Sequence, residues 1–241
     1  MPVKEAPSAC PAGMQRIEGG TLDTLERGRD VAISSFCIDE HEVTVAEFRA
    51  CVASGKCARE CAPGAACPEV PARTDWDNPE EDARVSQFCN GAAKDDRGQH
   101  PVNCVSFGEA ESFCAAQEKR LPTGDEWEWA ARGARVPSPW GSPVAKDEIC
   151  WGKPKKRAGT CAVETFEKDK TAAGVRDLGG NVSEWVRPPQ RSKHPAAVWA
   201  YGASWYAIDD GYARAALGGV QMPARRAETV GFRCAAAVGR G

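Results

Sequence analysis

Residues 120–133 read RLPTGDEWEWAARG, and this stretch carries the signals that delimit a short helix. Thr123 and Glu126 have the spacing of a capping box, in which each side chain accepts the backbone N–H of the other residue. Carboxylates in the first turn also favour the positive end of the helix dipole. Trp127 and two alanines in the next turn fall on one face, and Gly133 is well placed to end the helix. We therefore predict a short helix within residues 120–133 that buries an indole.

Two further capping boxes stand upstream, at residues 44–47 (TVAE) and 106–109 (SFGE). Apolar residues follow each box at helical spacing, which predicts one helix ended by Gly55 and another that leads into the quoted stretch. Residues 10–20 have the composition of an opening turn and a short strand. Residues 31–38 are rich in β-forming residues and predict one strand. Local signals thus indicate short helices and short strands.

Length, charge and hydropathy exclude several classes of protein. The 241 residues fit one large domain or two small ones and suffice to bury a core. The 31 basic and 34 acidic residues give a net charge of -3, without the basic excess of a nucleic-acid-binding surface. No apolar run reaches the length of a transmembrane helix. We predict a flexible lead-in over residues 1–9 and a single domain over residues 10–241.

The chain contains 12 cysteines, which is a high and even number. None is spaced Cys-x-x-Cys and there are only 3 histidines, so zinc ribbons and fingers are poorly supported. Disulfides are favoured, and they predict an extracytoplasmic location: periplasmic, cell-surface or secreted. The N-terminus shows no hydrophobic signal segment, and we expect a targeting peptide to be absent from this sequence because it was removed.

Two loop-rich segments carry most of the remaining cysteines. Residues 56–102 form a long cysteine-rich excursion that we expect disulfides to order. It either shapes a binding rim or is a covalently pinned surface loop. The basic run at residues 153–157 (KPKKR) either attracts an anionic partner or is a solvated loop.

The quoted stretch strongly resembles the signature of the formylglycine-generating enzyme (sulfatase-modifying factor) family. Residues 177–185 (DLGGNVSEW) and 231–235 (GFRCA) resemble two further motifs of this family, in the same order. The resemblance implies an α+β, C-type-lectin-like fold with short helices around small antiparallel sheets, rich in loops and stapled by disulfides. It also implies a disulfide between Cys114 and Cys234. For Cys150 and Cys161, proximity in the sequence favours a second.

The resemblance also says where catalytic chemistry would lie. Catalytic members carry two cysteines, five positions apart, after a Gly-Gly-Ser-Tyr/Trp strand; these thiolates bind copper(I) and oxidise a cysteine of a sulfatase to formylglycine. The matching strand here is residues 201–206 (YGASWY), and the two positions hold Ala207 and Tyr212. Copper(I) prefers soft thiolates, which neither side chain supplies. We therefore expect no copper and no formylglycine formation.

A calcium site is the best remaining candidate for a metal. In the family, residues matching the Asp177 side chain, the carbonyls of Gly180 and Val182, and the Glu184 carboxylate hold a calcium ion. Carboxylates and carbonyls around a Gly-Gly turn are the hard oxygen ligands that calcium prefers. The alternative is that Asp177 caps a turn and Glu184 pairs with an arginine.

Residues 199–219 would line the cleft of this fold. They offer aromatic and charged side chains suited to recognition: Trp199, Tyr201, Trp205, Tyr206, Asp209, Asp210, Tyr212 and Arg214. A core strand and its turn would contain similar residues. Our preferred prediction is a non-catalytic domain that binds a protein or small-molecule ligand here and is supported by structural calcium. The alternatives are an oxidoreductase of the same family, formylglycine-generating or of the non-heme iron type, that uses other residues, and a purely structural envelope component.

Overall fold

The computed structural model describes residues 10–23, 30–57, 88–92, 96–132, 149–152, 159–190, 192, 197–207, 218–223 and 225–239. Within these ranges the chain forms short helices and short strands. The helices are α1 (Val45–Ala53), η1 (Asn90–Ala92), α3 (Phe107–Ala115) and α4 (Gly124–Arg132). The strands are β1 (Met14–Ile17), β2 (Gly20–Asp23), β3 (Asp30–Ile33), β4 (Phe36–Asp39), β5 (Ser183–Val186), β6 (Val198–Tyr201), β7 (Gly218–Gln221), β8 (Val230–Gly231) and β9 (Ala235–Ala237).

All three predicted capping boxes are present and open α1, α3 and α4. At α4, the Thr123 N–H donates to the Glu126 carboxylate over 2.8 Å, and the Glu126 N–H donates to the Thr123 hydroxyl over 3.1 Å. The same reciprocal bonds open α1 and α3. Gly55 takes a positive φ of 71° after α1, as its predicted role requires. Gly133, predicted to end α4, lies outside the described residues.

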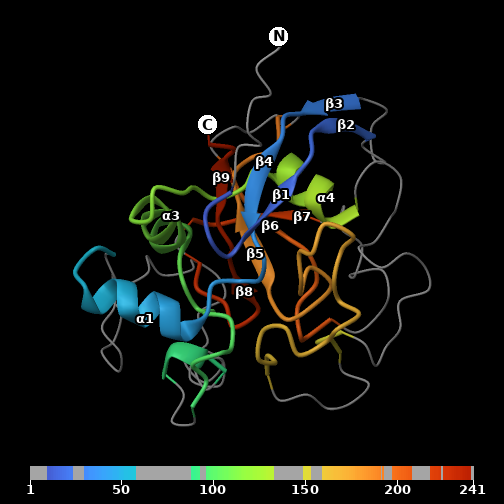
Figure 1. Ribbon diagram of the computed structural model, residues 1–241. Coiled ribbons are helices and arrows are strands. Elements are labelled where there is room, and N and C mark those ends of the chain that lie inside the picture. The colour runs from blue at the N-terminus through green and yellow to red at the C-terminus, as the bar shows by residue number, and fades with distance from the viewer. Residues whose placement is uncertain are drawn as a thin grey trace.

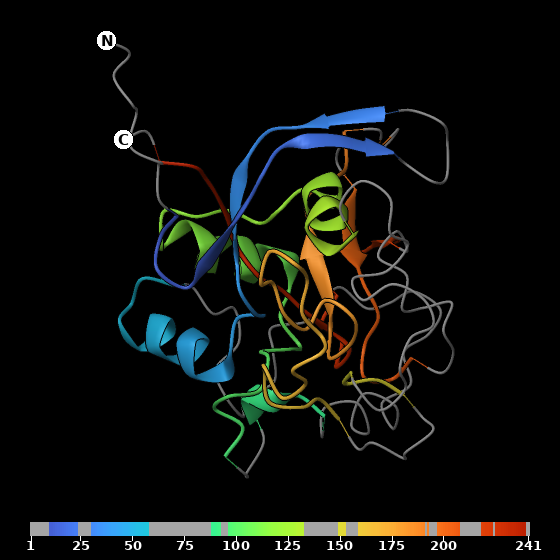
Figure 2. The same cartoon turned by 45° about the vertical axis from the view of Figure 1, so that its right-hand side comes forward.

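Within the described ranges the strands form three small sheets, ordered β1-β4-β9, β2-β3 and β7-β6-β5-β8. All pairings are antiparallel except that of β5 with β8. The prediction of one strand over residues 31–38 is wrong, because the chain breaks at Ser34 and Ser35 and its two halves join different sheets. Figure 2 shows β2 and β3 as a ribbon that extends beyond β1 and β4.

The four-stranded sheet is covered on both faces, and its alternating residues divide between two cores. Trp185 of β5 joins the core that contains Phe48 of α1 and Phe113 of α3. Val186, the next residue, joins the core that contains Trp127 of α4. Figure 1 accordingly shows α1 and α3 on one side of β5 and β6, and α4 on the other. The fold is therefore α+β, with short helices packed around small sheets, as expected.

Disulfides fasten the loop-rich parts of the described chain. The Cys114–Cys234 bond joins residues 120 apart, and the Cys150–Cys161 bond joins residues 11 apart, so both expected pairings are present. Three further bonds are Cys10–Cys37, Cys51–Cys57 and Cys89–Cys104. The middle of the cysteine-rich excursion and the basic run at 153–157 lie outside the described residues. Each helix in the described part of the chain is too short or too polar to cross a membrane.

Candidate functional site

A fully buried ion pair between Glu184 and Arg233 lies at the centre of the three sequence motifs. The Arg233 Nε lies 3.0 and 2.8 Å from the two Glu184 carboxylate oxygens, and its Nη2 lies 2.8 Å from Oε1. Trp127 of α4 donates its indole N–H to Oε2 over 2.6 Å. Both side chains of the pair are inaccessible to solvent. The helix motif, the strand β5 and the C-terminal motif thus converge on one carboxylate.

The charge of Arg233 is secured by its surroundings. Burial alone would lower the pKa of the guanidinium, but the attraction and hydrogen bonds of Glu184, helped by Glu42 and Asp177, outweigh burial and leave that pKa above its ordinary value. Removing either partner of such a pair leaves an uncompensated buried charge. The pair is therefore a structural requirement of the site.

Asn181 connects the turn before β5 to three other segments. Its backbone N–H donates to the Cys150 carbonyl over 2.6 Å, and its carbonyl accepts the Trp205 N–H over 2.8 Å. Its side-chain oxygen accepts the Cys161 N–H over 3.0 Å, and its amide group donates to Glu42 over 3.4 Å. The turn thereby joins the Cys150–Cys161 loop to the segment that follows β6.

The turn requires a glycine at position 180. A Cβ atom at this position would lie 2.4 Å from the Cys150 carbonyl oxygen, closer than real Cβ atoms approach. Asp177 and Asn181 take positive φ angles of 58° and 61° on either side of it. Asx residues tolerate this left-handed region better than most side chains.

Three further carboxylates are buried around the Glu184–Arg233 pair, on Glu42, Asp169 and Asp177, which are 0, 1 and 2% exposed. Burial raises the pKa of Glu42 well above its ordinary value, and the neighbouring Asp177 carboxylate raises it further. Burial also raises the pKa of Asp169 well above its ordinary value, and the negative charge of Asp177 raises it further. Burial raises the pKa of Asp177 to about 6. Ionisation of these three carboxylates is therefore unfavourable in the buried cluster unless additional positive charge compensates it.

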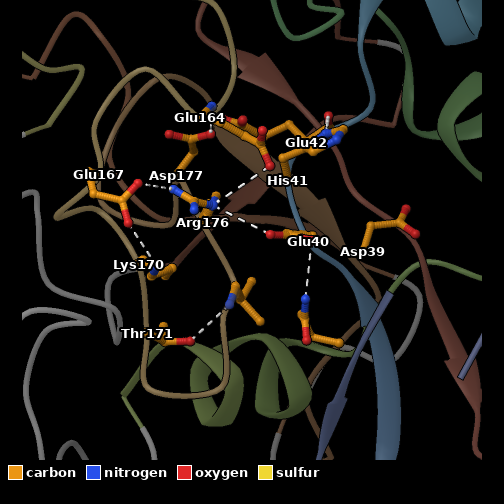
Figure 3. A network of polar contacts seen from close by, with 12 residues as sticks. Asp39, Glu40, His41, Glu42, Glu164, Glu167, Lys170, Thr171, Arg176 and Asp177 are labelled. Carbon is orange, nitrogen blue, oxygen red and sulfur yellow. Dashed lines mark hydrogen bonds and ion pairs between the residues drawn. The ribbon is translucent and has the colours of Figure 1, made fainter. Parts of the chain in front are cut away.

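Figure 3 shows the rim of this cluster. Asp177 accepts the backbone N–H of Glu164 over 2.7 Å, so Asp177 does form a turn contact. Beside it, the Arg176 side chain reaches outward to the Glu167 and Glu40 carboxylates, at 3.2 and 3.4 Å. Arg176 therefore directs its positive charge to the rim.

The predicted calcium ligands lie on the turn that Asn181 organises and, in the case of Glu184, on the following strand β5, but they are not equally available. Glu184 already accepts two contacts at each oxygen, which fills its acceptor positions. The arginine pairing considered as the alternative is therefore what the structure shows. Across the described ranges, no three His, Cys, Asp or Glu side chains converge into a ready-made metal centre. Calcium stays a prediction, with Asp177 as the better placed carboxylate.

The predicted recognition residues divide between core and surface. Tyr201 and Trp205 are 2 and 4% exposed, which corrects their assignment as surface contacts. Trp199 is half-buried against the α4 core. Tyr206 is 52% exposed and packs edge-on against Trp205, 5.5 Å between ring centroids. The other four predicted residues lie outside the described ranges: Asp209, Asp210, Tyr212 and Arg214.

Ala207 lies where the resemblance places the first copper thiolate. Its methyl group joins a small apolar cluster with Ile149, Trp151 and Ala203. All the described cysteines are in disulfides, so within the described chain none offers a free thiolate to this position.

Comparison with known proteins agrees with the convergence of the three motifs. Residues 2–238 match the family described as the sulfatase-modifying factor enzyme 1-like domain. The chain belongs to this family. It is 32% identical over 156 residues to the inactive C-alpha-formylglycine-generating enzyme 2 of Bos taurus, covering 59% of this chain and 52% of that protein. It is 28% identical over 243 residues to the formylglycine-generating enzyme of Thermomonospora curvata, covering 83 and 73%. The hercynine oxygenase of Mycolicibacterium smegmatis is 32% identical over 72% of this chain and 42% of its own length.

The chain spans about half the length of the first curated relatives it matches. Solved structures share its fold over nearly the whole chain. PvdO from Pseudomonas aeruginosa aligns with a TM-score of 0.67 and 20% identity, over 93% of this chain and 94% of PvdO. CarF aligns with a TM-score of 0.65 and 19% identity, over 95 and 99%. At these identities the likeness shows the family fold alone.

Sequence reasoning assigned no role to several residues that the structure brings into the site. Arg233 stood inside a quoted motif, but its partner was not identified. Glu42 lies just upstream of the capping box that begins at Thr44, and that pattern indicated only the helix. Asp169 lies in a loop without any recognisable signal. Their proximity arises only when the separate segments pack together.

Proposed function

We propose that this family member is a non-catalytic, extracytoplasmic recognition domain that binds a protein or small ligand through residues 199–219. The observation that carries the proposal is Ala207, whose methyl group packs with Ile149 and Trp151 where catalytic relatives need a copper-binding thiolate. The disulfides among the described residues support a chain that folds in an oxidising compartment.

The relatives support this division within one family. The Bos taurus and Mus musculus relatives carry the name of an inactive formylglycine-generating enzyme. Other relatives are named as formylglycine-generating enzymes or hercynine oxygenases. One scaffold therefore accommodates both kinds of protein, and the local residues decide between them.

The described part of the chain exposes a few large apolar side chains. Tyr206 is 52% exposed, and Val220 and Met222, at and just beyond the end of β7, are 56 and 61% exposed. Among the described residues these are the exposed large hydrophobic side chains. An aromatic side chain held against a buried neighbour, as Tyr206 is held by Trp205, loses little conformational entropy on binding.

The first test asks whether the chain binds a family-type substrate without converting it. A labelled peptide with the cysteine motif of sulfatases is titrated for binding by fluorescence anisotropy and incubated with copper-treated protein for mass spectrometry. We expect saturable binding and no aldehyde above a copper-only control. Conversion above that control would establish the oxidoreductase alternative, and absence of binding would refute a peptide of this class as the ligand.

Variants of the proposed surface and of the copper position test which residues are responsible for binding and for the loss of copper chemistry. Tyr206→Ala should weaken binding about tenfold, which corresponds to about 1.4 kcal/mol. Glu18→Gln, an exposed substitution outside the proposed surface, should leave binding unchanged. Ala207→Cys combined with Tyr212→Cys should gain copper(I) affinity if the family scaffold still presents these two positions to each other.

A further inference from the structure

The indole of Trp151 is buried, but its N–H group has no hydrogen-bond acceptor among the described residues. Trp151 is 2% exposed, and its Nε1 atom is itself buried and unpaired there. The other buried indoles of the described chain all donate, over 2.6, 2.9 and 3.1 Å: those of Trp127, Trp185 and Trp205. A buried indole N–H normally has a partner, because leaving it unpaired costs free energy. The Trp151 N–H is therefore available to an acceptor that a ligand supplies.

Trp151 lies beside the segment to which ligand binding is assigned. Its side chain joins a small apolar cluster with Ile149, Ala203 and Ala207. Ala207 occupies the position of the first copper-binding thiolate of catalytic relatives, and the neighbouring Tyr206 is 52% exposed. The unpaired donor thus belongs to the same cluster as two residues of the proposed ligand-binding segment.

Backbone hydrogen bonds on both sides of Trp151 hold it in this place. Gly152, the next residue, donates its N–H to the Trp205 carbonyl over 2.9 Å. The carbonyl of Cys150, the preceding residue, accepts the Asn181 N–H over 2.6 Å. Because the indole is already fixed and buried, little conformational entropy is lost when an acceptor binds to it.

The surroundings of Trp151 select a neutral acceptor. The side chains of its cluster are apolar, so they offer no positive charge to a carboxylate or a phosphate. An anion buried among them would be uncompensated, whereas an amide carbonyl is neutral and accepts readily from an N–H. Ala203 and Ala207 carry only methyl groups, which obstruct the approach of a narrow carbonyl group very little. The carbonyl of a peptide bond meets these requirements.

We propose that Trp151 determines ligand specificity by donating its indole N–H to an amide carbonyl of a bound peptide beside Ala207. This role rests on the proposed function and narrows its ligand class to peptides. An apolar side chain next to the bound carbonyl would pack on the exposed ring of Tyr206. The N–H then fixes the position of the peptide backbone, and the aromatic ring supplies apolar contact.

The first experiment removes the indole N–H and keeps the shape of the ring. Trp151→benzothienylalanine exchanges the N–H group for a sulfur atom in a fused ring of nearly the same size. The labelled sulfatase-motif peptide should then bind about three- to tenfold more weakly, which is the effect of one neutral hydrogen bond. The melting temperature without peptide should stay the same or rise, because a buried unpaired donor has been removed.

The same replacement at Trp185 is the matched control. Trp185 is also fully buried, but its indole N–H donates to the Val105 carbonyl over 2.9 Å. Trp185→benzothienylalanine should lower the melting temperature, because the carbonyl loses its partner, and should leave the peptide affinity unchanged. A merely structural role of Trp151 would instead make the two variants behave alike.

The second experiment uses small probes, so that it does not depend on the peptide. The indole N–H resonance of Trp151, assigned by its loss in Trp151→Phe, is followed in proton–nitrogen NMR spectra. N-methylacetamide, which carries the carbonyl of a peptide bond, should move this resonance downfield. Acetate at the same concentration should move it less, because its charge would be buried without compensation.

The outcomes distinguish failure of this role from failure of the proposed function. If the peptide binds equally to wild type and to Trp151→benzothienylalanine, the role of Trp151 is refuted and the binding domain stands. If the peptide does not bind but N-methylacetamide moves the Trp151 resonance, the role stands and this peptide is the wrong ligand. A resonance that ignores both probes, or moves further with acetate, refutes the assignment of a neutral carbonyl to Trp151.

Discussion

Removing the Cys114–Cys234 disulfide should destabilise the chain more than removing the Cys150–Cys161 disulfide. The perturbation is a pair of double variants, in which both cysteines of one bond are replaced by alanine. The two bonds close loops of 120 and 11 residues. In the chain-entropy treatment these loops correspond to about 5 and about 3 kcal/mol of stabilisation, a difference of about 2 kcal/mol.

Packing should add to the difference in the same direction. Cys114 and Cys234 are both fully buried in the core with Phe113 and Phe232. Cys161, in contrast, is only half-buried. Loss of sulfur atoms from a tightly packed core leaves a cavity that adds to the cost. Alanine is the suitable replacement, because a serine hydroxyl in this core would be buried without a partner.

The assay is urea denaturation followed by circular dichroism, together with thermal melting under non-reducing conditions. For a chain of this size, an extra 2 kcal/mol lowers the melting temperature by about 4–8 °C. Peptide mapping should confirm that the remaining disulfides are unchanged in each variant. Equal losses of stability in the two variants, or a larger loss without Cys150–Cys161, would refute the loop-entropy reasoning.

Three further predictions concern the buried site. Glu184→Gln should cost about 3–5 kcal/mol in urea denaturation, because it leaves the buried Arg233 charge without its partner. Glu167→Gln, at an exposed and solvent-screened ion pair, should leave the stability nearly unchanged in the same assay. Gly180→Ala should cost about 1–3 kcal/mol in the same assay, because its methyl group would meet a backbone carbonyl oxygen at 2.4 Å; a neutral result would mean that the turn yields. In chelator, the free energy of unfolding should fall as the pH rises from about 4 to about 6. Burial raises the pKa of Asp177 from 3.8 to about 6, so the native state keeps a proton that the unfolded state has released; stability that is flat or rising over this window would contradict it.

Local sequence signals predicted the helices well because the capping box is a local device. Its two hydrogen bonds join residues three positions apart, so four residues such as 44–47 or 106–109 contain the whole interaction. The prediction of one strand over residues 31–38 was wrong because strand pairing is not a local interaction. The break at Ser34 and Ser35 depends on which strands each half meets. The first half pairs with β2, whereas the second half pairs with β9, which lies far from it in the chain.

Only those site residues that lie within the recognised motifs could be predicted from the sequence. Glu184 stood in a recognised motif, and its pairing with an arginine had been considered. The burial of the Glu42 and Asp169 carboxylates could not be predicted from the sequence, because a charged residue is normally exposed. Only the packing of distant segments makes them buried neighbours of Asp177. Positions of this kind, where local preference and tertiary burial conflict, are where functional features tend to gather.

The buried network and the cleft position depend on different contacts, which bears on how this fold can serve different functions. Trp127, Glu184 and Arg233 connect α4, β5 and the C-terminal segment through hydrogen bonds that do not involve Ala207. Ala207 contacts a separate apolar cluster, after the end of β6. Exchanging a thiolate for a methyl group there therefore leaves the network that holds the motifs together intact. A scaffold arranged in this way can keep its fold while the residues of its cleft, and with them its chemistry, change.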